Sequence, residues 1–116
     1  MAESFQVPFF DASADATVAN LKTTSGLVFF IELSNIDNAD YFLQLFDALA
    51  ADVTLGTTTP NLSLLIPAGD STFRGAMDKV FSPPLKFETA ISYGVTTTAT
   101  GSTGPTTALA MNAVYR

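Results

Sequence analysis

The chain contains no cysteine, no histidine and no tryptophan. Without cysteine, disulfides and thiolate metal sites are excluded, and the sequence does not indicate whether the protein works in an oxidising or a reducing compartment. The absence of histidine removes the commonest general base and the commonest metal ligand. No Gly-x-Ser-x-Gly motif and no phosphate-binding glycine loop occurs either. We therefore expect no catalytic residues, no metal site and no cofactor, in a protein that is not an enzyme.

Charge is also scarce. Only 14% of the residues are charged, against about 25% in an average protein, while 47% are hydrophobic and the mean hydropathy is +0.32. A small monomer with so few charged residues would leave much apolar surface exposed to water. We therefore expect other subunits to cover part of the surface and the protein to be a homo-oligomer. The five basic residues are scattered and the net charge is −6, which argues against nucleic-acid binding. The longest uncharged run, 89–115, is rich in Thr, Gly and Ser and is not a membrane span.

At 116 residues the chain is expected to form one domain, organised around the stretch 26–47. This stretch, GLVFFIELSNIDNADYFLQLFD, holds two apolar runs that alternate with a period of two, which predicts two strands. The polar residues between the runs have the chemistry of a turn, so we predict a central β-hairpin. The alternative is a short helix over 40–51, capped by Asp40. The core residues predicted here are Leu27, Phe29, Ile31, Leu43 and Leu45.

Further strands are expected over 16–21, 61–67, 85–95 and 108–115, from the same alternation. The segment 71–82 is ambiguous, because its apolar residues also have helical spacing and Pro83-Pro84 would end such a helix. The chain as a whole therefore predicts an all-β fold. It would be an antiparallel, jelly-roll-like β-sandwich of about seven or eight short strands, with at most one short helix near 71–80.

The N-terminal segment 1–25 is expected to be either an arm or an edge strand, and 26–116 the sandwich domain. Phe5, Phe9 and Phe10 place a large apolar area near the end of the chain, and Pro8 argues against a central strand. As an edge strand the segment would dock on its own core; as an arm it would pack on a neighbouring subunit.

Several aromatic residues lie off the predicted core face and form the candidate interface. Phe30, Phe42 and Phe46 have the opposite parity to the predicted core residues, so a second sheet or another protomer must cover them. Burying one Phe fully stabilises by roughly 1.5–3 kcal/mol. The predicted interface residues are Phe5, Phe9, Phe10, Phe30, Phe42 and Phe46.

Four polar residues between the two apolar runs have two possible roles. Asn35, Asp37, Asn38 and Asp40 carry oxygens of the kind that bind Ca²⁺. Their spacing does not match an EF-hand loop, and the same side chains commonly hold backbone N–H groups in turns. We therefore predict a turn at this position.

Four segments, taken in order, form a further pattern: YFLQLFDA at 41–48, TPNLSLLIPAG at 59–69, FSPPLKFETAISYGVT at 81–96 and NAVYR at 112–116. Together they resemble a group of small virion proteins of tailed bacteriophages that have a compact β-sandwich. The segments cover much of 27–116, and 74–80, RGAMDKV, departs from the pattern, since a shorter link is expected there.

The resemblance implies a structural role in a virion, with no catalytic residues to carry over. It implies a capsid decoration or cement protein that binds the outer surface of the capsid and stabilises the assembled shell. Its partners would be the major capsid protein and further copies of itself, with a homotrimer as the expected oligomer. The alternative is a tail-fibre, baseplate or receptor-binding module of a phage tail, and a free-standing hydrolase or lectin domain is a third hypothesis.

Overall fold

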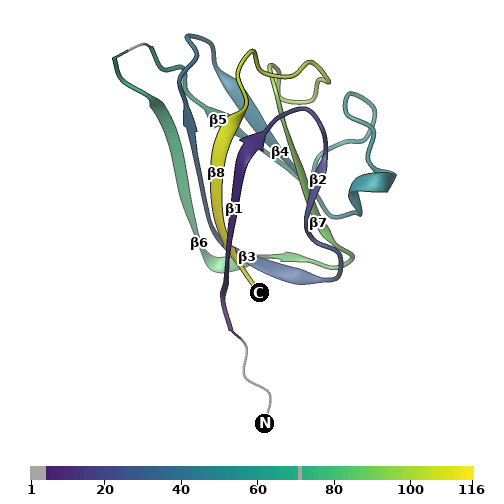
Figure 1. Ribbon diagram of the computed structural model, residues 1–116. Helices are drawn as coiled ribbons and strands as arrows, with labels where there is room; N and C mark the ends of the chain where they lie inside the picture. The colour runs from purple at the N-terminus through teal and green to yellow at the C-terminus, as the bar shows by residue number, and fades with distance from the viewer. Residues whose placement is uncertain (1–4, 71) are drawn as a thin grey trace.

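The computed structural model describes residues 5–70 and 72–116 and is built from β-strands (Figure 1). The only helix in the described residues is the single 3₁₀ turn η1, Ala50–Asp52. Within those residues no helix is long and apolar enough to span a membrane. The strands are β1 Val7–Ala14, β2 Ala19–Lys22, β3 Gly26–Asn35, β4 Tyr41–Phe46, β5 Leu62–Ile66, β6 Gly75–Phe87, β7 Ile91–Thr96 and β8 Leu109–Tyr115.

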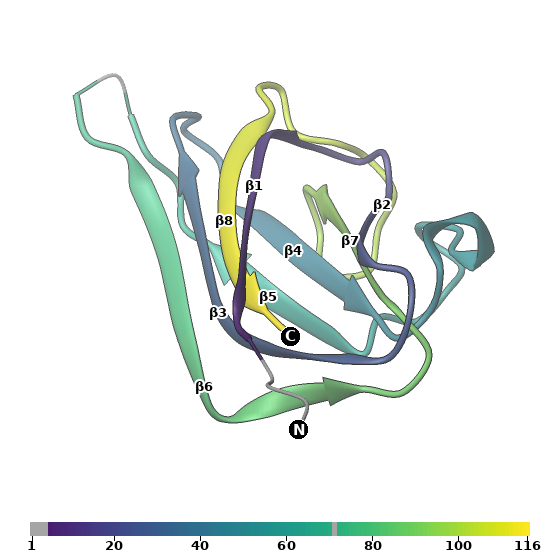
Figure 2. The same cartoon turned by 60° about the horizontal axis from the view of Figure 1, so that its bottom comes forward.

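The eight strands form two antiparallel four-stranded sheets. Sheet A has the order β1-β8-β3-β6, and sheet B has the order β2-β7-β4-β5. Figure 2 shows the two sheets as separate layers, with η1 on the side of sheet B away from sheet A. This strand order, in which the chain crosses repeatedly between the sheets, is that of an eight-stranded jelly roll. The predicted all-β sandwich is confirmed.

The core lies between the two sheets and is mainly aliphatic, with Tyr41, Tyr93 and Phe87 as its buried aromatic members. Each strand sends alternate side chains into it, as the period of two predicts. Ile66 and Met111, for example, are fully buried and come from different sheets. The buried members of the cluster include Leu21, Val28, Ile31, Leu33, Tyr41, Leu43, Leu45, Ile66, Phe87, Ile91, Tyr93, Val95, Leu109 and Met111.

The predicted central hairpin is wrong, although both of its strands exist. β3 pairs with β6 and β8 in sheet A, whereas β4 pairs with β5 and β7 in sheet B. The turn between them therefore carries the chain from one sheet to the other. The alternative helix over 40–51 is also wrong, because 41–46 is a strand and only three residues of η1 are helical.

A bulge in β3 also changes the predicted core. The register of β3 shifts between Val28 and Phe30 against both neighbouring strands. Such a bulge adds one residue and reverses the alternation beyond it. As a result Val28 is fully buried, whereas Leu27 and Phe29 are only partly buried.

The segment 71–82, which the sequence leaves ambiguous, forms no helix in its described residues, because β6 begins at Gly75 and continues through Pro83-Pro84 as a strand. β6 lies at the edge of sheet A, where a proline need not donate a hydrogen bond. The register supports this placement: Phe30 pairs with Val80 and Val28 pairs with Leu85, so 81–84 bulges out of the ladder. Edge prolines and Lys79 also protect an edge strand from pairing with other chains.

The strand expected over 85–95 is divided between the two sheets. β6 ends at Phe87, and β7 begins at Ile91 in sheet B. The intervening turn is held by Asp47, whose carboxylate accepts hydrogen bonds from the backbone N–H groups of Glu88, Thr89 and Ala90 at 3.0, 2.8 and 3.3 Å. A side chain about forty residues away therefore breaks a pattern that looks continuous in the sequence.

The N-terminal segment contributes one strand to each sheet. β1 lies at the edge of sheet A and pairs with β8, with Phe9 opposite Ala113, and β2 pairs with β7 in sheet B. The division of the chain at residue 25 into an arm or edge strand and a sandwich domain stays a prediction, and residues 1–4 lie outside the described residues.

Candidate interaction surface

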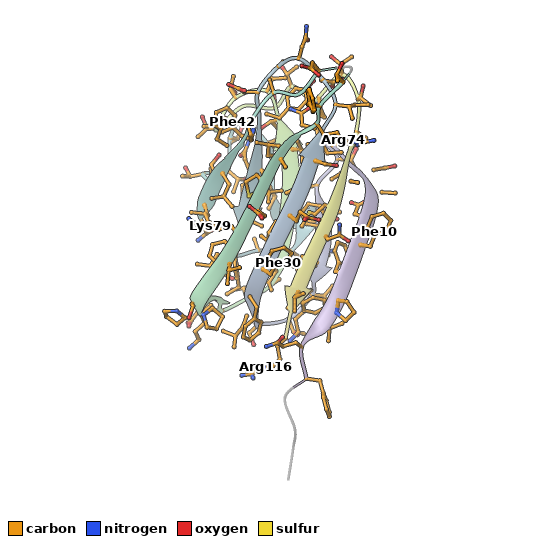
Figure 3. All side chains as sticks on the ribbon, turned by 90° about the vertical axis from the view of Figure 1, so that its left-hand side faces the viewer. Phe10, Phe30, Phe42, Arg74, Lys79 and Arg116 are labelled. Atoms are coloured by element: carbon orange, nitrogen blue, oxygen red, sulfur yellow. The ribbon has the colours of Figure 1, made fainter. Side chains whose placement is uncertain are left out.

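The six aromatic residues predicted to form an interface fall into three environments. Phe46 is 1% exposed, and Phe9 packs on the core, with its ring edge-to-face against Tyr93 at a centroid distance of 6.0 Å. Phe30 and Phe42 are partly exposed and lie on different sheets, as Figure 3 shows. Phe5 and Phe10 are largely exposed. The structure therefore brings only Phe10 and Phe30 together on one face.

That face is the outer side of sheet A, turned toward the viewer in Figure 3. Ile31 and Leu33 of β3 point into the core, so Phe30 and Glu32 point outward. Residues directly opposite each other in antiparallel strands share a face. The register of β1, β8, β3 and β6 therefore assigns the remaining members of this face, which we call the sheet A face.

The sheet A face is arranged in three rows that run across the strands. The first row is entirely apolar, the second passes from aromatic to acidic, and the third has small side chains. In order from β1 to β6, the first row is Pro8, Val114, Phe30 and Val80, and the second is Phe10, Asn112, Glu32 and Asp78. The third row, from β8 to β6, is Ala110, Ser34 and Ala76.

The apolar members of this face are strongly exposed at its two edges. Val80 on β6 is 70% exposed and Phe10 on β1 is 62% exposed, and Pro8 is also exposed. Phe30 and Val114 lie between them on the two central strands and are partly covered. Apolar side chains that are contiguous on one exposed face mark a protein-interaction surface more often than the same residues scattered singly.

The outer face of sheet B is different because a loop covers part of it. Gln44 of β4 points outward, yet it is buried, and its Nε2 donates hydrogen bonds to Thr96 Oγ1 at 2.7 Å and to the carbonyl of Gly101 at 3.1 Å. Ser63 Oγ donates to the carbonyl of Ala99 at 2.8 Å. The Thr- and Gly-rich segment after β7 thus packs over sheet B, while the sheet A face stays open.

The polar residues between β3 and β4 act as a turn. Asn35 donates through Nδ2 to the carbonyls of Ala39 and Pro67, and its Oδ1 accepts from the N–H of Asp37 at 2.9 Å. Asp40 accepts from the N–H of Ala68 at 2.8 Å. These bonds join the β3–β4 turn to the start of the β5–β6 loop, which is the structural use that the sequence predicted.

Asp37 connects the same turn to the segment before β8. Its carboxylate accepts from the hydroxyl of Tyr41 at 2.5 Å and from both the N–H and the hydroxyl of Thr107 at 2.9 Å. The hydrogen bond from Tyr41 is the main cause that lowers the pKa of Asp37 below its usual value. Among the residues that the structure describes, no group of three or more acidic side chains is placed to hold a metal ion.

A cavity of about 150 Å³ lies near the turn that Asp47 holds. Both carboxylate oxygens of Asp47 already accept backbone hydrogen bonds, and Lys86 forms an exposed ion pair with Glu88 at 3.3 Å. The walls are otherwise mainly apolar, so the cavity is suited to an apolar group. Its lining residues are Asp47, Asn61, Leu62, Leu85, Lys86 and Phe87.

Sequence reasoning missed three of the four residues of the apolar row on the sheet A face. Val80 lies in the segment 71–82, which the sequence leaves ambiguous, and the alternation of the chain does not single out Pro8 or Val114 as interface residues. Their common feature is that each lies in register with Phe30 or with a neighbour of Phe30. Only the pairing of β1, β8, β3 and β6 could have revealed it.

Comparison with protein-family models and with curated proteins finds no match. Among solved structures, the chain is similar to one from the cryo-EM structure of a virus-like particle of the giant freshwater prawn Macrobrachium rosenbergii extra small virus. The identity is 10% and the TM-score is 0.37, over 99% of this chain and 80% of that chain.

Proposed function

We propose that this protein is a structural component of a virion, a cement protein that binds the outside of an assembled capsid. The observation that carries the proposal is the sheet A face, an exposed apolar row on the outer side of a jelly roll whose other sheet is partly covered by the segment after β7. The jelly roll is a fold used in viral capsid domains, though also in lectins and other proteins. The four segments that resemble phage virion proteins support the same role.

The mechanism is thermodynamic linkage. A protein that binds the assembled shell but not the separate subunits shifts the equilibrium toward the shell. At a free concentration of one hundred times Kd, each occupied site stabilises the shell by about 2.7 kcal/mol. A cement protein therefore needs a binding surface and a rigid scaffold rather than reactive groups, and the stacked sheets supply that scaffold.

Self-association is part of the proposal, with a trimer as the expected state. The supporting observations are the low charge of the chain and the exposed aromatic side chains outside the sheet A face, Phe5 before β1 and Phe73 in the β5–β6 loop. The start of β1 and the β5–β6 loop lie at opposite ends of the sandwich (Figure 1). Contacts at the ends of a protomer would leave the sheet A face free for the shell.

The experiment uses empty shells of the major capsid protein encoded in the same genome. Purified protein should sediment with these shells and raise the temperature at which they disrupt in a calorimeter. Unassembled capsid protein is the control and should not bind, because linkage requires preference for the assembled state. Gold-labelled protein found on tails instead of heads would reject the cement function in favour of a tail module.

A further inference from the structure

Two carboxylates lie side by side on the sheet A face. Glu32 of β3 is directly opposite Asp78 of β6, and both belong to the row that points away from the core. On the other side, Asn112 of β8 donates a hydrogen bond to Glu32 Oε1 at 3.3 Å. The ion pair found within the described residues joins Lys86 to Glu88, at the end of β6. Within the part of the chain that the structure describes, neither carboxylate of the pair therefore forms an ion pair.

This arrangement costs the free protein stability. Like charges directly opposite each other on antiparallel strands repel and destabilise the sheet. The pair is also adjacent to the apolar row, since Phe30 and Val80 are two residues along from Glu32 and Asp78 on the same strands. A partner that covers the row must also cover the acids, and it would bury them unpaired unless it carried a positive charge.

We propose that the sheet A face is the surface that binds the capsid, and that its partner is an apolar protein surface with an arginine or lysine that inserts between Glu32 and Asp78. The proposal rests on the function proposed above and adds the face and the chemistry of its partner. An arginine suits the position well, because its planar guanidinium donates to two carboxylates at once. The apolar row would form the water-free centre of the contact. The acidic pair would fix the orientation of the partner.

A second copy of this chain does not fit the same face. A symmetric pair uses the same patch on both partners. None of the eleven residues in the three rows of the face is basic, so face-to-face pairing would bring four carboxylates together without a cation. The small third row, Ala110, Ser34 and Ala76, lets a partner backbone approach closely but supplies no charge. Charge complementarity thus selects a different protein as the occupant.

The test measures binding to the empty shells by sedimentation, with two variants of the face. The double variant Glu32→Gln/Asp78→Asn should bind about tenfold more weakly or worse, because the partner's cation is then buried without its acids. The free double variant should melt at the same temperature as wild type or higher, because the repulsion is gone. Its binding should also lose most of the salt dependence that wild type shows. The variant Val80→Ser should weaken binding by a similar factor through lost apolar contact.

Matched controls come from the opposite side of the molecule. Leu65→Ser removes an apolar side chain that is 50% exposed on the outer face of sheet B, and Asp52→Asn removes an exposed carboxylate on η1. Both controls should bind shells as tightly as wild type.

The outcomes separate the two proposals. If wild type does not bind shells, the cement function fails, and this assignment fails with it. If wild type binds and both face variants bind equally well, the cement function stands and the sheet A face is rejected as its surface. If the face variants alter only the oligomeric state, the face is a contact between copies and the basic-partner proposal is wrong.

Discussion

Asp47 accepts a hydrogen bond from the backbone N–H of Thr89 at 2.8 Å, forty-two residues further along the chain. The same carboxylate also holds the neighbouring N–H groups of Glu88 and Ala90. Burial raises the pKa of Asp47, but these three donors outweigh it, so the net effect is a lowered pKa. The contact fixes where the chain leaves sheet A and enters sheet B, so it joins the two halves of the jelly roll.

Replacing Asp47 should therefore destabilise the whole sandwich. We expect Asp47→Asn to lower the free energy of unfolding by about 1–3 kcal/mol, because hydrogen bonds to a charged acceptor are replaced by weaker ones. Urea denaturation should show a lower midpoint with an unchanged slope. The matched control Asp52→Asn removes an exposed carboxylate from η1 and should leave the midpoint unchanged. Equal midpoints for both variants would show that the turn holds without Asp47.

The Asp47 contact also explains which parts of the fold the sequence could predict. The alternation of Leu109, Met111 and Ala113 reports which side chains of β8 are buried, because that pattern depends only on the local backbone. The class of fold follows from many such short strands. Alternation does not report which strand is the neighbour, so β3 and β4 were expected to pair although they lie in different sheets.

Three differences between the sequence pattern and the fold share one physical cause, which is that distant contacts override the local pattern. Phe87, Thr89 and Ile91 continue one parity, and only Asp47 reveals the break between them. The ambiguous segment 71–82 becomes part of a strand because β3 provides the thirteen-residue β6 with a partner. The list of predicted interface residues is incomplete for the same reason, since Val80 lies beside Phe30 only through the register of β6.

The assigned faces of β4 and β5 can be checked with one pair of leucines. Leu45 is fully buried between the sheets, whereas Leu65 points outward from β5. We expect Leu45→Ala to cost about 2–5 kcal/mol of stability, as for other buried leucines that leave a cavity, and Leu65→Ala to cost less than 1 kcal/mol. Thermal and urea unfolding would measure both. A larger loss for Leu65→Ala would mean that the register of β5 is shifted by one residue.

Stability should fall in acid because several aspartates have lowered pKa values. The hydrogen bond from Tyr41 lowers the pKa of Asp37. The N–H groups of Phe73 and Thr72 lower the pKa of Asp70. The pKa of Asp47 is lowered by the backbone N–H groups of the turn that it holds. A carboxyl with a lower pKa in the folded state binds fewer protons than the unfolded chain, so stability rises with pH through that range. Its contribution is complete above the ordinary value of 3.8 and is lost as the pH falls below it.

The melting temperature should therefore be nearly constant from about pH 5 to 7, where no histidine or cysteine titrates, and should drop below about pH 4. Scanning calorimetry between pH 2.5 and 7 would measure it. In Asp47→Asn the acid decline should be shallower, because one of the contributing groups no longer titrates. A midpoint of the decline near pH 6 would contradict the assignment to these aspartates.

The oligomeric state tests the expectation drawn from the low charge of the chain. Light scattering at micromolar concentration should give about three times the 12.2 kDa protomer mass. Phe73→Ser changes an exposed side chain in the β5–β6 loop, 74% exposed, and should favour smaller species if that loop forms the contact. A monomer for wild type would reject the trimer and leave the shell as the only partner that covers the apolar surface.

The adjacent residues Phe9 and Phe10 separate an edge strand from a detachable arm. Phe9 packs on the core against Tyr93, whose hydroxyl also donates to Asp11 at 2.6 Å, whereas Phe10 points outward on the sheet A face. If β1 is a stable part of its own protomer, Phe9→Ala should cost about 2–4 kcal/mol, because a large, partly buried side chain that packs on the core is removed. Phe10→Ala should barely change the stability of the protein but should weaken binding to the shells. Urea denaturation and shell sedimentation of both variants measure the two effects. If Phe9→Ala leaves the protomer as stable as Phe10→Ala does, β1 is not anchored in its own sandwich, and the arm interpretation of the N-terminal segment is the correct one.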